Sequence, residues 1–174
     1  MRVIGGEFRS RRLKSIPGQE TRPTPDRLRE TLFDVLAPRV EGAVFVDAYA
    51  GTGAVGIEAL SRGARRAIFL EKNRKAVEVI RENLVSLGAM DRARIAQGSV
   101  QLMLAAHPGD IVFLDPPSEQ DGEYALALGV LGENPPALTV VQHSKHFAPA
   151  DEYGKLRRTR VLKQGDNVLS FYAA

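Results

Sequence analysis

Two acidic residues and three glycines in the first half of the sequence have types and spacing that suit a small ligand. They are Asp47, Gly51, Gly53, Gly56 and Glu71. The glycines match a phosphate-binding turn between a strand and a helix, and Glu71 comes twenty residues after Gly51, where dinucleotide sites carry a ribose-binding acid. The spacing predicts a nucleotide-like ligand but leaves its identity open.

Asp47 favours one of two ligands. An ionised carboxylate one tight turn from Gly51 would repel the pyrophosphate of a dinucleotide such as NAD. It would attract the ammonium and sulfonium groups of S-adenosylmethionine, whose carboxylate suits a helix N-terminus near Gly53 and whose ribose suits Glu71. We therefore expect S-adenosylmethionine. A dinucleotide, and a strand-turn-helix unit whose glycines only permit close packing, stay open as alternatives.

A second chemical motif, Asp115-Pro116-Pro117, follows another apolar run. The prolines remove amide donors from the loop and leave carbonyls that can accept hydrogen bonds. The exocyclic amine of a base needs acceptors for its hydrogens before its nitrogen becomes nucleophilic, and Asp115 and the Pro116 carbonyl are such acceptors. The motif therefore predicts in-line methyl transfer to an amine. The alternative is that Asp115 caps a helix beginning near Asp121 and the prolines stiffen the loop.

The elements that must position these motifs alternate between strand and helix. Strands are predicted at 44–47, 66–70, 93–96, 110–114 and 138–141, a helix at 73–87 with Gly88 as its stop, and a C-terminal hairpin at 156–162 and 167–172. This alternation predicts a parallel sheet covered on both faces and closed by an antiparallel hairpin. Because ligands bind beyond the carboxyl ends of such strands, we expect Asp47, Glu71 and Asp115 in one crevice.

Length and composition bound the class of protein. The chain has 174 residues, 44% of them hydrophobic, which predicts one domain with a single core. Cysteine is absent, so we exclude a disulfide framework and the cysteine nucleophile that methylation of a pyrimidine ring carbon ordinarily needs. No apolar run approaches the roughly 20 residues of a membrane helix. We expect a cytoplasmic, metal-free monomer, with a basic extension at 1–20 and a catalytic core at 21–174.

Positive charge is concentrated near the N-terminus. The net charge is +3, and residues 1–30 hold eight Lys/Arg against four Asp/Glu. This asymmetry indicates an acidic partner, most commonly nucleic acid, and the alternative is a solvated surface that aids solubility. The residues expected to contact phosphates are Arg9, Arg11, Arg12, Lys14, Arg22 and Arg27.

The first elements are predicted from turn and cap residues. Residues 1–16 are expected to form a small basic hairpin. The following helix is expected to have Thr24 as its N-cap, Pro25 at its first position and Pro38 just past its end. We expect Arg29 on its solvent face.

Together the motifs resemble the class I S-adenosylmethionine-dependent methyltransferases that modify amino groups. More narrowly, the chain resembles the RsmD family, bacterial enzymes that methylate the exocyclic amine (N2) of one guanine in 16S ribosomal RNA. Besides the motifs above, the resemblance lies in residues 2–6, 21–24, 26–27, 29–30, 56–64 and 169–172. It implies a Rossmann-like fold with seven strands, and a small-subunit ribosomal particle as partner. The resemblance assigns the methionine part of the cofactor to Asp47, Gly51 and Gly53, the ribose to Glu71, the adenine edge to Ser99 and Val100, and the target amine to Asp115, Pro116 and Pro117.

Three positions depart from the family pattern. Ser118 stands where an aromatic residue usually stacks on the flipped base. Ser99 stands where an acid more usually contacts the adenine, and Gln142 where the family often has Glu. Candidates for the stacking residue, each alternatively a core aromatic, are Tyr124, Phe147 and Phe8.

Other functions fit part of this pattern. A methyltransferase with this fold could act on another amine, such as adenine in DNA or RNA or a protein glutamine. A non-catalytic RNA-binding protein that retains the fold is favoured by Ser118 alone. An NAD-dependent reductase is disfavoured by Asp47 and has no recognisable proton donor.

Overall fold

The computed structural model describes residues 1–18, 25–117 and 121–174. The strands are β1 (Val44–Ala48), β2 (Arg66–Glu71), β3 (Ala93–Gln97), β4 (Ile111–Leu114), β5 (Leu138–Ser144), β6 (Glu152–Tyr153), β7 (Leu156–Gln164) and β8 (Asn167–Ala173). The helices are α1 (Asp26–Val40), α2 (Ala54–Ser61), α3 (Arg74–Leu87), α4 (Val100–Met103) and α5 (Asp121–Glu133), with a 3-10 turn η1 (Met90–Arg92). None of the helices in these ranges is long and apolar enough to cross a membrane.

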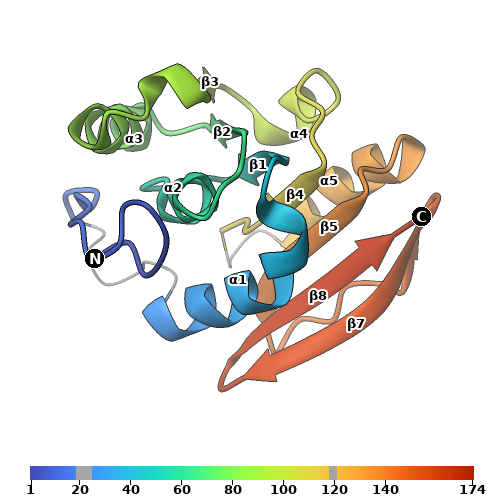
Figure 1. Ribbon diagram of the computed structural model, residues 1–174. Helices are drawn as coiled ribbons and strands as arrows, with labels where there is room; N and C mark the ends of the chain where they lie inside the picture. The colour runs from blue at the N-terminus through green and yellow to red at the C-terminus, as the bar shows by residue number, and fades with distance from the viewer. Residues whose placement is uncertain (19–24, 118–120) are drawn as a thin grey trace.

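The strands form one mixed sheet in the order β3-β2-β1-β4-β5-β8-β7-β6. The first five in this order are parallel, so their carboxyl ends meet at one edge, as the alternation predicted. Buried side chains alternate between the two faces: Phe45 packs with α1 and α2, and Val46 packs with α4 and α5. Helices therefore cover both faces of the sheet (Figure 1).

Helix α3 is specified by residues at its two ends. Asn73 Oδ1 accepts hydrogen bonds from the N–H groups of Lys75 and Ala76 at 2.9 and 3.2 Å. Gly88 ends the helix in the left-handed conformation, with φ 67°. The side chains predicted to face inward are buried: Ala76, Val77, Ile80, Leu84 and Leu87.

Helix α1 begins and ends differently from the prediction. Pro25 is its N-cap rather than its first residue, and the predicted cap Thr24 lies outside the described residues. Pro38 lies inside the last turn, and the helix continues to Val40. Val40 is buried with Leu36 in the core. Burial of this apolar stripe therefore outweighs the hydrogen bond that proline cannot donate.

The C-terminal hairpin has its predicted antiparallel pairing, with β8 between β5 and β7. The sheet described has eight strands rather than seven because the two-residue β6 pairs with the start of β7. Helix α5 approaches β6 closely at Gly132, where a Cβ would lie 2.1 Å from the Tyr153 carbonyl oxygen. A side chain at this position would separate the two elements.

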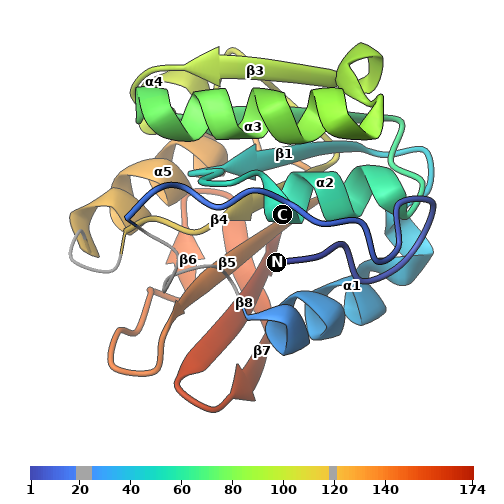
Figure 2. The ribbon, with the colours of Figure 1, turned by 90° about the vertical axis from the view of Figure 1, so that its left-hand side faces the viewer.

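The N-terminal segment is a looser loop than the expected hairpin. One isolated antiparallel bridge joins Arg2 and Arg12. Val3, Phe8 and Leu13 are buried against α2 and α3. Figure 2 shows this segment running across α2. The basic extension, which we call the arm (residues 1–18), is thus packed on the core.

A buried carboxylate on α2 holds the arm. Glu58 accepts hydrogen bonds from the N–H groups of Ile4 and Gly5, each at 2.9 Å. Arg62 Nε donates to the same carboxylate at 2.9 Å. Two backbone amides of the arm thus depend on one side chain of the core.

Arg29 of α1 lies against the same carboxylate. Its side chain is 0% exposed, and its Nε is 3.4 Å from Glu58 Oε1. It also donates hydrogen bonds to the Arg2 carbonyl and, at 3.1 Å, to the exposed carboxylate of Asp26. The expectation that Arg29 faces solvent is therefore wrong, because the arm covers this side of α1 and supplies an acceptor for it.

We expect Glu58→Ala to lower the free energy of unfolding by about 3–5 kcal/mol, because it removes the one buried carboxylate beside the Arg29 charge and leaves two amides without their partner. Urea unfolding at neutral pH measures this loss. Glu78→Ala is the matched control, since Glu78 forms an exposed pair with Arg74 at 3.6 Å and should change stability by less than about 0.5 kcal/mol. Equal small losses in both variants would contradict the role given to Glu58.

Candidate active site

The carboxyl ends of β1, β2, β4 and β5 border a cavity of about 870 Å³. Small-molecule sites usually measure about 300–1,000 Å³. The residues predicted for cofactor and amine that line it are Asp47, Gly51, Glu71, Ser99, Val100, Asp115, Pro116 and Pro117. The exception is Gly53, the N-cap of α2, with a left-handed φ of 82°. The three strand-end acids therefore share one crevice, as expected.

Asp47 is a buried acid at the centre of the sheet edge. Its side chain is 2% exposed, and Oδ2 accepts a hydrogen bond from the Gly56 N–H at 2.8 Å. Burial raises the pKa of Asp47 well above its usual range, the Gly56 hydrogen bond opposes this, and the nearby charges of Asp115 and Glu71 raise it further. A cation in the cavity would favour the ionised form.

Glu71 joins two loops at the cavity wall. Its Oε1 accepts from the Gly51 N–H at 2.8 Å, and its Oε2 accepts from the Asn73 N–H at 2.7 Å. A carboxylate has about four acceptor positions, so both oxygens can also accept from the two hydroxyls of a ribose. The side chain is thus held in place while acceptor capacity is left for a ligand.

Two helix starts flank these acids. Ala54 and Val55, in the first turn of α2, line the cavity, and the positive end of the helix dipole there suits a carboxylate. Ser99 is the N-cap of α4 without a side-chain cap hydrogen bond, and Val100 is buried beside it. This part of the wall offers one hydroxyl and one apolar side chain to a ligand.

Asp115 lies beside Asp47 on the same face of the sheet. Asp47 pairs with Phe113, and side chains two residues apart on a strand share a face, so Asp115 follows Phe113 onto the Asp47 side. Burial raises the pKa of Asp115 to about 7. Pro116 and Pro117 continue the wall. In the described part of the chain, no group of three or more His, Cys, Asp or Glu side chains is placed to hold a metal ion.

The aromatic residues of the cavity are only partly those predicted. Tyr124 lines it and stacks on Phe147, with ring centroids 4.7 Å apart. Phe8 of the arm is buried against α2 and α3, outside the cavity lining, so it is not a stacking candidate. Ser118 lies outside the described residues.

Tyr49 is a cavity residue that the sequence reasoning missed. It is half-buried, has a positive φ of 61°, and its hydroxyl donates to Glu123 Oε2 at 2.7 Å. Its position between Asp47 and the glycines was the available signal, since a turn residue there faces the ligand. Burial and Glu123 both raise the pKa of the Tyr49 hydroxyl, so it stays protonated.

Gln142 and His143 form the wall at the end of β5. The His143 ring bonds through Nε2 to Ser170 Oγ at 2.8 Å and through Nδ1 to the Ser144 carbonyl at 2.9 Å. Burial lowers the pKa of His143. With both ring nitrogens engaged, His143 supports the wall and is not a free base.

The tip of the arm lies at the opposite end of α2 from the cavity. The N–H groups of Glu7 and Phe8 bond to Ser61, the last residue of α2, at 2.8 and 2.9 Å, whereas Ala54 at its first turn lines the cavity. The helix has eight residues, so the two ends are about 10 Å apart. The tip of the arm, where Arg9 follows Phe8, therefore lies away from the cavity, whereas both ends of the described arm reach it, since Met1, Ser15 and Ile16 line the cavity.

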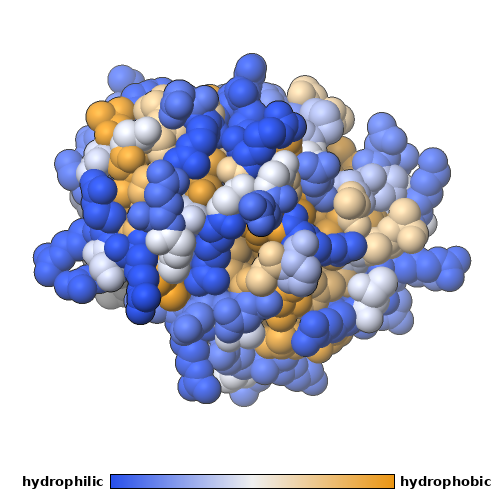
Figure 3. All heavy atoms as spheres, viewed as in Figure 1, coloured by the Kyte–Doolittle hydropathy of each residue, from blue (hydrophilic) through white to orange (hydrophobic). Residues whose placement is uncertain are grey.

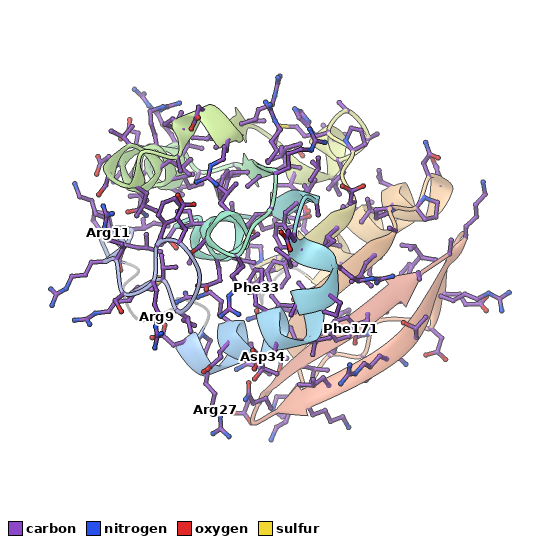
Figure 4. The ribbon with its side chains drawn as sticks, in the orientation of Figure 1. Arg9, Arg11, Arg27, Phe33, Asp34 and Phe171 are labelled. Carbon is purple, nitrogen blue, oxygen red and sulfur yellow. The ribbon has the colours of Figure 1, made fainter. Side chains whose placement is uncertain are left out.

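The residues predicted to contact phosphates differ in whether their charged groups already bond to another part of the protein. Lys14 pairs with Glu82 at 2.9 Å, and Arg11 donates to the Ser86 carbonyl at 2.8 Å. Arg22 lies outside the described residues. Figure 4 shows Arg9, Arg11 and Arg27 pointing outward, and Figure 3 shows that this side of the molecule is largely hydrophilic. Arg9, Arg12 and Arg27 are all exposed.

Comparisons with known proteins agree with this geometry. The family model described as Conserved hypothetical protein 95 matches residues 1–173. Ribosomal RNA small subunit methyltransferase D of Escherichia coli is 43% identical over 119 residues, which are 67% of this chain and 60% of that protein. YlbH of Bacillus subtilis, provisionally named an rRNA methyltransferase, is 32% identical over 99% of this chain and 98% of its own. A solved Escherichia coli structure, provisionally named methyltransferase yhhF, is 34% identical with a TM-score of 0.86, covering 99% of this chain and 97% of that chain.

The parallel strands, the antiparallel C-terminal pair and the cavity at the strand ends define a class I methyltransferase fold. The family model covers nearly the whole chain. The chain belongs to the RsmD family of S-adenosylmethionine-dependent RNA methyltransferases. The family, the fold class and the cofactor expected from the sequence are confirmed, and the roles of individual site residues stay predictions.

We expect Asp115→Asn to stabilise the unliganded protein relative to the wild type, increasingly as the pH rises from about 4 to about 7. In the unfolded chain an aspartate ionises near pH 4, whereas the pKa of Asp115 in the fold is about 7. The folded state thus retains a proton that the unfolded state has lost, and wild-type stability falls through this window.

Urea unfolding of both proteins at several pH values tests this expectation, and the difference should grow by a few kcal/mol, on the order set by the pKa shift. Asp34→Asn, the same substitution on the exposed side of α1 (Figure 4), is the control for a carboxylate outside the cavity. A pH-independent difference for Asp115→Asn would show that burial does not raise its pKa.

Proposed function

We propose that this protein transfers a methyl group from S-adenosylmethionine to N2 of a guanine in 16S ribosomal RNA of the small ribosomal subunit. The observation that carries the proposal is the single cavity that holds a ligand-binding acid cluster on β1 and β2 and an amine-accepting loop after β4. The relatives named as small subunit rRNA methyltransferases support rRNA as the substrate.

The cofactor side of the cavity fits S-adenosylmethionine group by group. Asp47 would attract the ammonium and sulfonium, and the α2 start with Gly51 and Gly53 would hold the carboxylate. Glu71 would accept from the ribose hydroxyls. Ser99 and Val100 would border the adenine. When bound, the cofactor supplies a methyl group on a positively charged sulfur.

The amine side of the cavity would make the nitrogen that receives the methyl group nucleophilic. Asp115 and the Pro116 carbonyl would accept the two N2 hydrogens, so the nitrogen lone pair is directed at the methyl carbon. The N–C bond forms as the C–S bond breaks, and the extra proton leaves the nitrogen through Asp115 or solvent. Burial raises the pKa of Asp115 to about 7, and a cation bound beside it would lower this pKa and favour the carboxylate form that accepts hydrogen bonds. Pro117 stiffens the loop that positions both acceptors.

The arm and the start of α1 would bind the RNA backbone beyond the target base. Arg9 and Arg12 of the arm and Arg27 of α1 are exposed and would contact phosphates directly. We propose that residues 1–20 and 21–174 act together as one domain, since the described arm packs on the core through Glu58. The protein would act as a monomer on a preformed ribonucleoprotein surface.

Mass spectrometry of rRNA from a deletion strain tests the proposal. One N2-methylguanosine should be missing from 16S rRNA and return when the gene is restored. Methyl transfer by the purified protein to small-subunit particles from that strain should refill the same position. A missing methyl on adenine, or unchanged rRNA modification in the deletion strain, would contradict guanine N2 of 16S rRNA as the substrate.

We expect S-adenosylhomocysteine at 100 times its dissociation constant to stabilise the fold by about 2.7 kcal/mol. NAD at the same concentration should leave the melting temperature unchanged, because its pyrophosphate would face Asp47 and Glu71. Thermal unfolding with each ligand measures both effects. Stabilisation by NAD alone would contradict the cofactor placement.

We expect Asp115→Ala to slow methyl transfer by about 10²–10³-fold, because one acceptor that strengthens as charge develops on the amine is lost. Asp115→Asn keeps an acceptor oxygen and should retain more activity. Single-turnover transfer to unmodified particles measures the rate. Calorimetry should show nearly parental S-adenosylhomocysteine affinity in both variants, and a large loss of affinity would make Asp115 a cofactor residue.

We expect the double change Arg9→Gln and Arg12→Gln to weaken RNA binding similarly for unrelated sequences. Each lost phosphate contact removes about 0.7–0.9 from the log-log dependence of affinity on salt, so the slope should flatten by roughly one to two units. Lys155→Gln, an exposed lysine near the opposite edge of the sheet, is the control. An unchanged slope would assign the arm's arginines to a solvated surface.

A further inference from the structure

Gln142, in β5 near its carboxyl end, carries a buried polar atom without a partner. The residue is 8% exposed and lines the cavity. Its Oε1 has no hydrogen-bond partner among the described residues. Buried side-chain oxygens are rarely left unpaired, because desolvation without a hydrogen bond is costly. A ligand in the cavity that donates a hydrogen would satisfy this oxygen.

The register of the sheet places Gln142 beside Asp115. Leu114 pairs with Val141 in the parallel β4–β5 ladder, so the next positions along the two strands are Asp115 and Gln142. Adjacent strands are about 4.8 Å apart, and residues at one level share a face. Asp47 lies one strand further away, on β1. Gln142 therefore borders the amine side of the cavity rather than the cofactor side.

The other polar groups at this strand end are already engaged. Tyr124 Oη donates to the Gln142 backbone carbonyl at 3.1 Å, which fixes the backbone and leaves the side-chain amide free. His143 is bonded at both ring nitrogens, to Ser170 and Ser144. Gln142 is thus the residue of this part of the wall whose side-chain acceptor is buried and unpaired.

A guanine edge matches this amide. With N2 held at Asp115 and Pro116, the next groups along the Watson–Crick edge are the N1–H donor and the O6 acceptor. An amide can accept from N1–H through Oε1 and donate from Nε2 to O6. A carboxylate in the same place could accept from N1–H but would repel O6. We propose that Gln142 determines base specificity by reading N1–H and O6 of the target guanine, an inference that rests on the proposed function.

A substrate pair that differs only at this edge tests the proposal. Small-subunit particles are reconstituted with 16S rRNA ligated to carry either guanosine or 2-aminopurine riboside at the nucleotide found by mass spectrometry. 2-Aminopurine keeps the N2 amine but lacks O6 and the N1 hydrogen. The wild type should methylate guanosine roughly ten- to a hundredfold faster in single turnover, the range that a two-bond base contact provides.

In Gln142→Met, which has a similar volume and no amide, the guanosine rate should fall to near the 2-aminopurine rate, and the 2-aminopurine rate should stay unchanged. Gln142→Glu should retain part of the preference through N1–H alone. Thr139→Val is the matched control, because Thr139 Oγ1 is also buried and unpaired on β5 but lies outside the cavity lining. Its guanosine preference should equal that of the wild type.

The outcomes separate the proposal from its premise. A wild type that methylates neither base overturns the proposed function and this inference with it. An active wild type whose preference persists in both Gln142 variants overturns the inference alone. Equal slowing of both bases, with weaker S-adenosylhomocysteine affinity by calorimetry, makes Gln142 a cofactor contact and also overturns it. A fall in melting temperature with unchanged preference assigns Gln142 a structural role.

Discussion

The cavity depends on the close approach of helix α2 to the sheet at Gly56. A Cβ there would lie 2.4 Å from Phe69 Cε1 and 3.1 Å from Asp47 Cβ, so any side chain would push the helix outward. At this distance the Gly56 N–H reaches Asp47 Oδ2, at 2.8 Å. The intervening turn is then tied by the hydrogen bond from the Gly51 N–H to Glu71. Helix, turn and two acids therefore hold their positions together, and a change at any one of them alters the ligand site.

The charges in this site favour a cation. Burial raises the pKa of Asp47 and of Asp115, and the neighbouring acid groups add to the effect at Asp47. A positively charged ligand would stabilise the ionised forms of both acids, whereas a pyrophosphate would increase the repulsion. The electrostatics thus choose between the two ligands that the glycine spacing alone leaves open. With such a cation bound, the Asp115 carboxylate would be available to accept a hydrogen bond from an amine at neutral pH.

The sequence predicted the features that are determined by residues close together in the chain or by the regular geometry of a parallel sheet. Strand-end acids at Asp47, Glu71 and Asp115 meet because parallel strands end at one edge, and Asn73 caps α3 through its own following amides. Arg29 could not be placed in this way, because its burial depends on a carboxylate 29 positions away and on an arm that the helical pattern does not reveal. Phe8 and Tyr49 are similar: whether an aromatic side chain faces core or cavity depends on the packing of distant segments.

The arm reaches the cavity at Met1, Ser15 and Ile16 but its tip does not, and this has a consequence for substrate recognition. The arm tip lies at the far end of α2, about one helix length from the residues that would meet the base. Asp115 is only partly exposed, in the wall of the cavity, so a base must leave its stack to reach it, at a cost of a few kcal/mol. Phosphate contacts at a distance can hold the RNA while the base turns inward, but they carry no information on its identity. Discrimination between bases must therefore come from the cavity wall, and the choice of site from the shape of the RNA that can contact arm and cavity together.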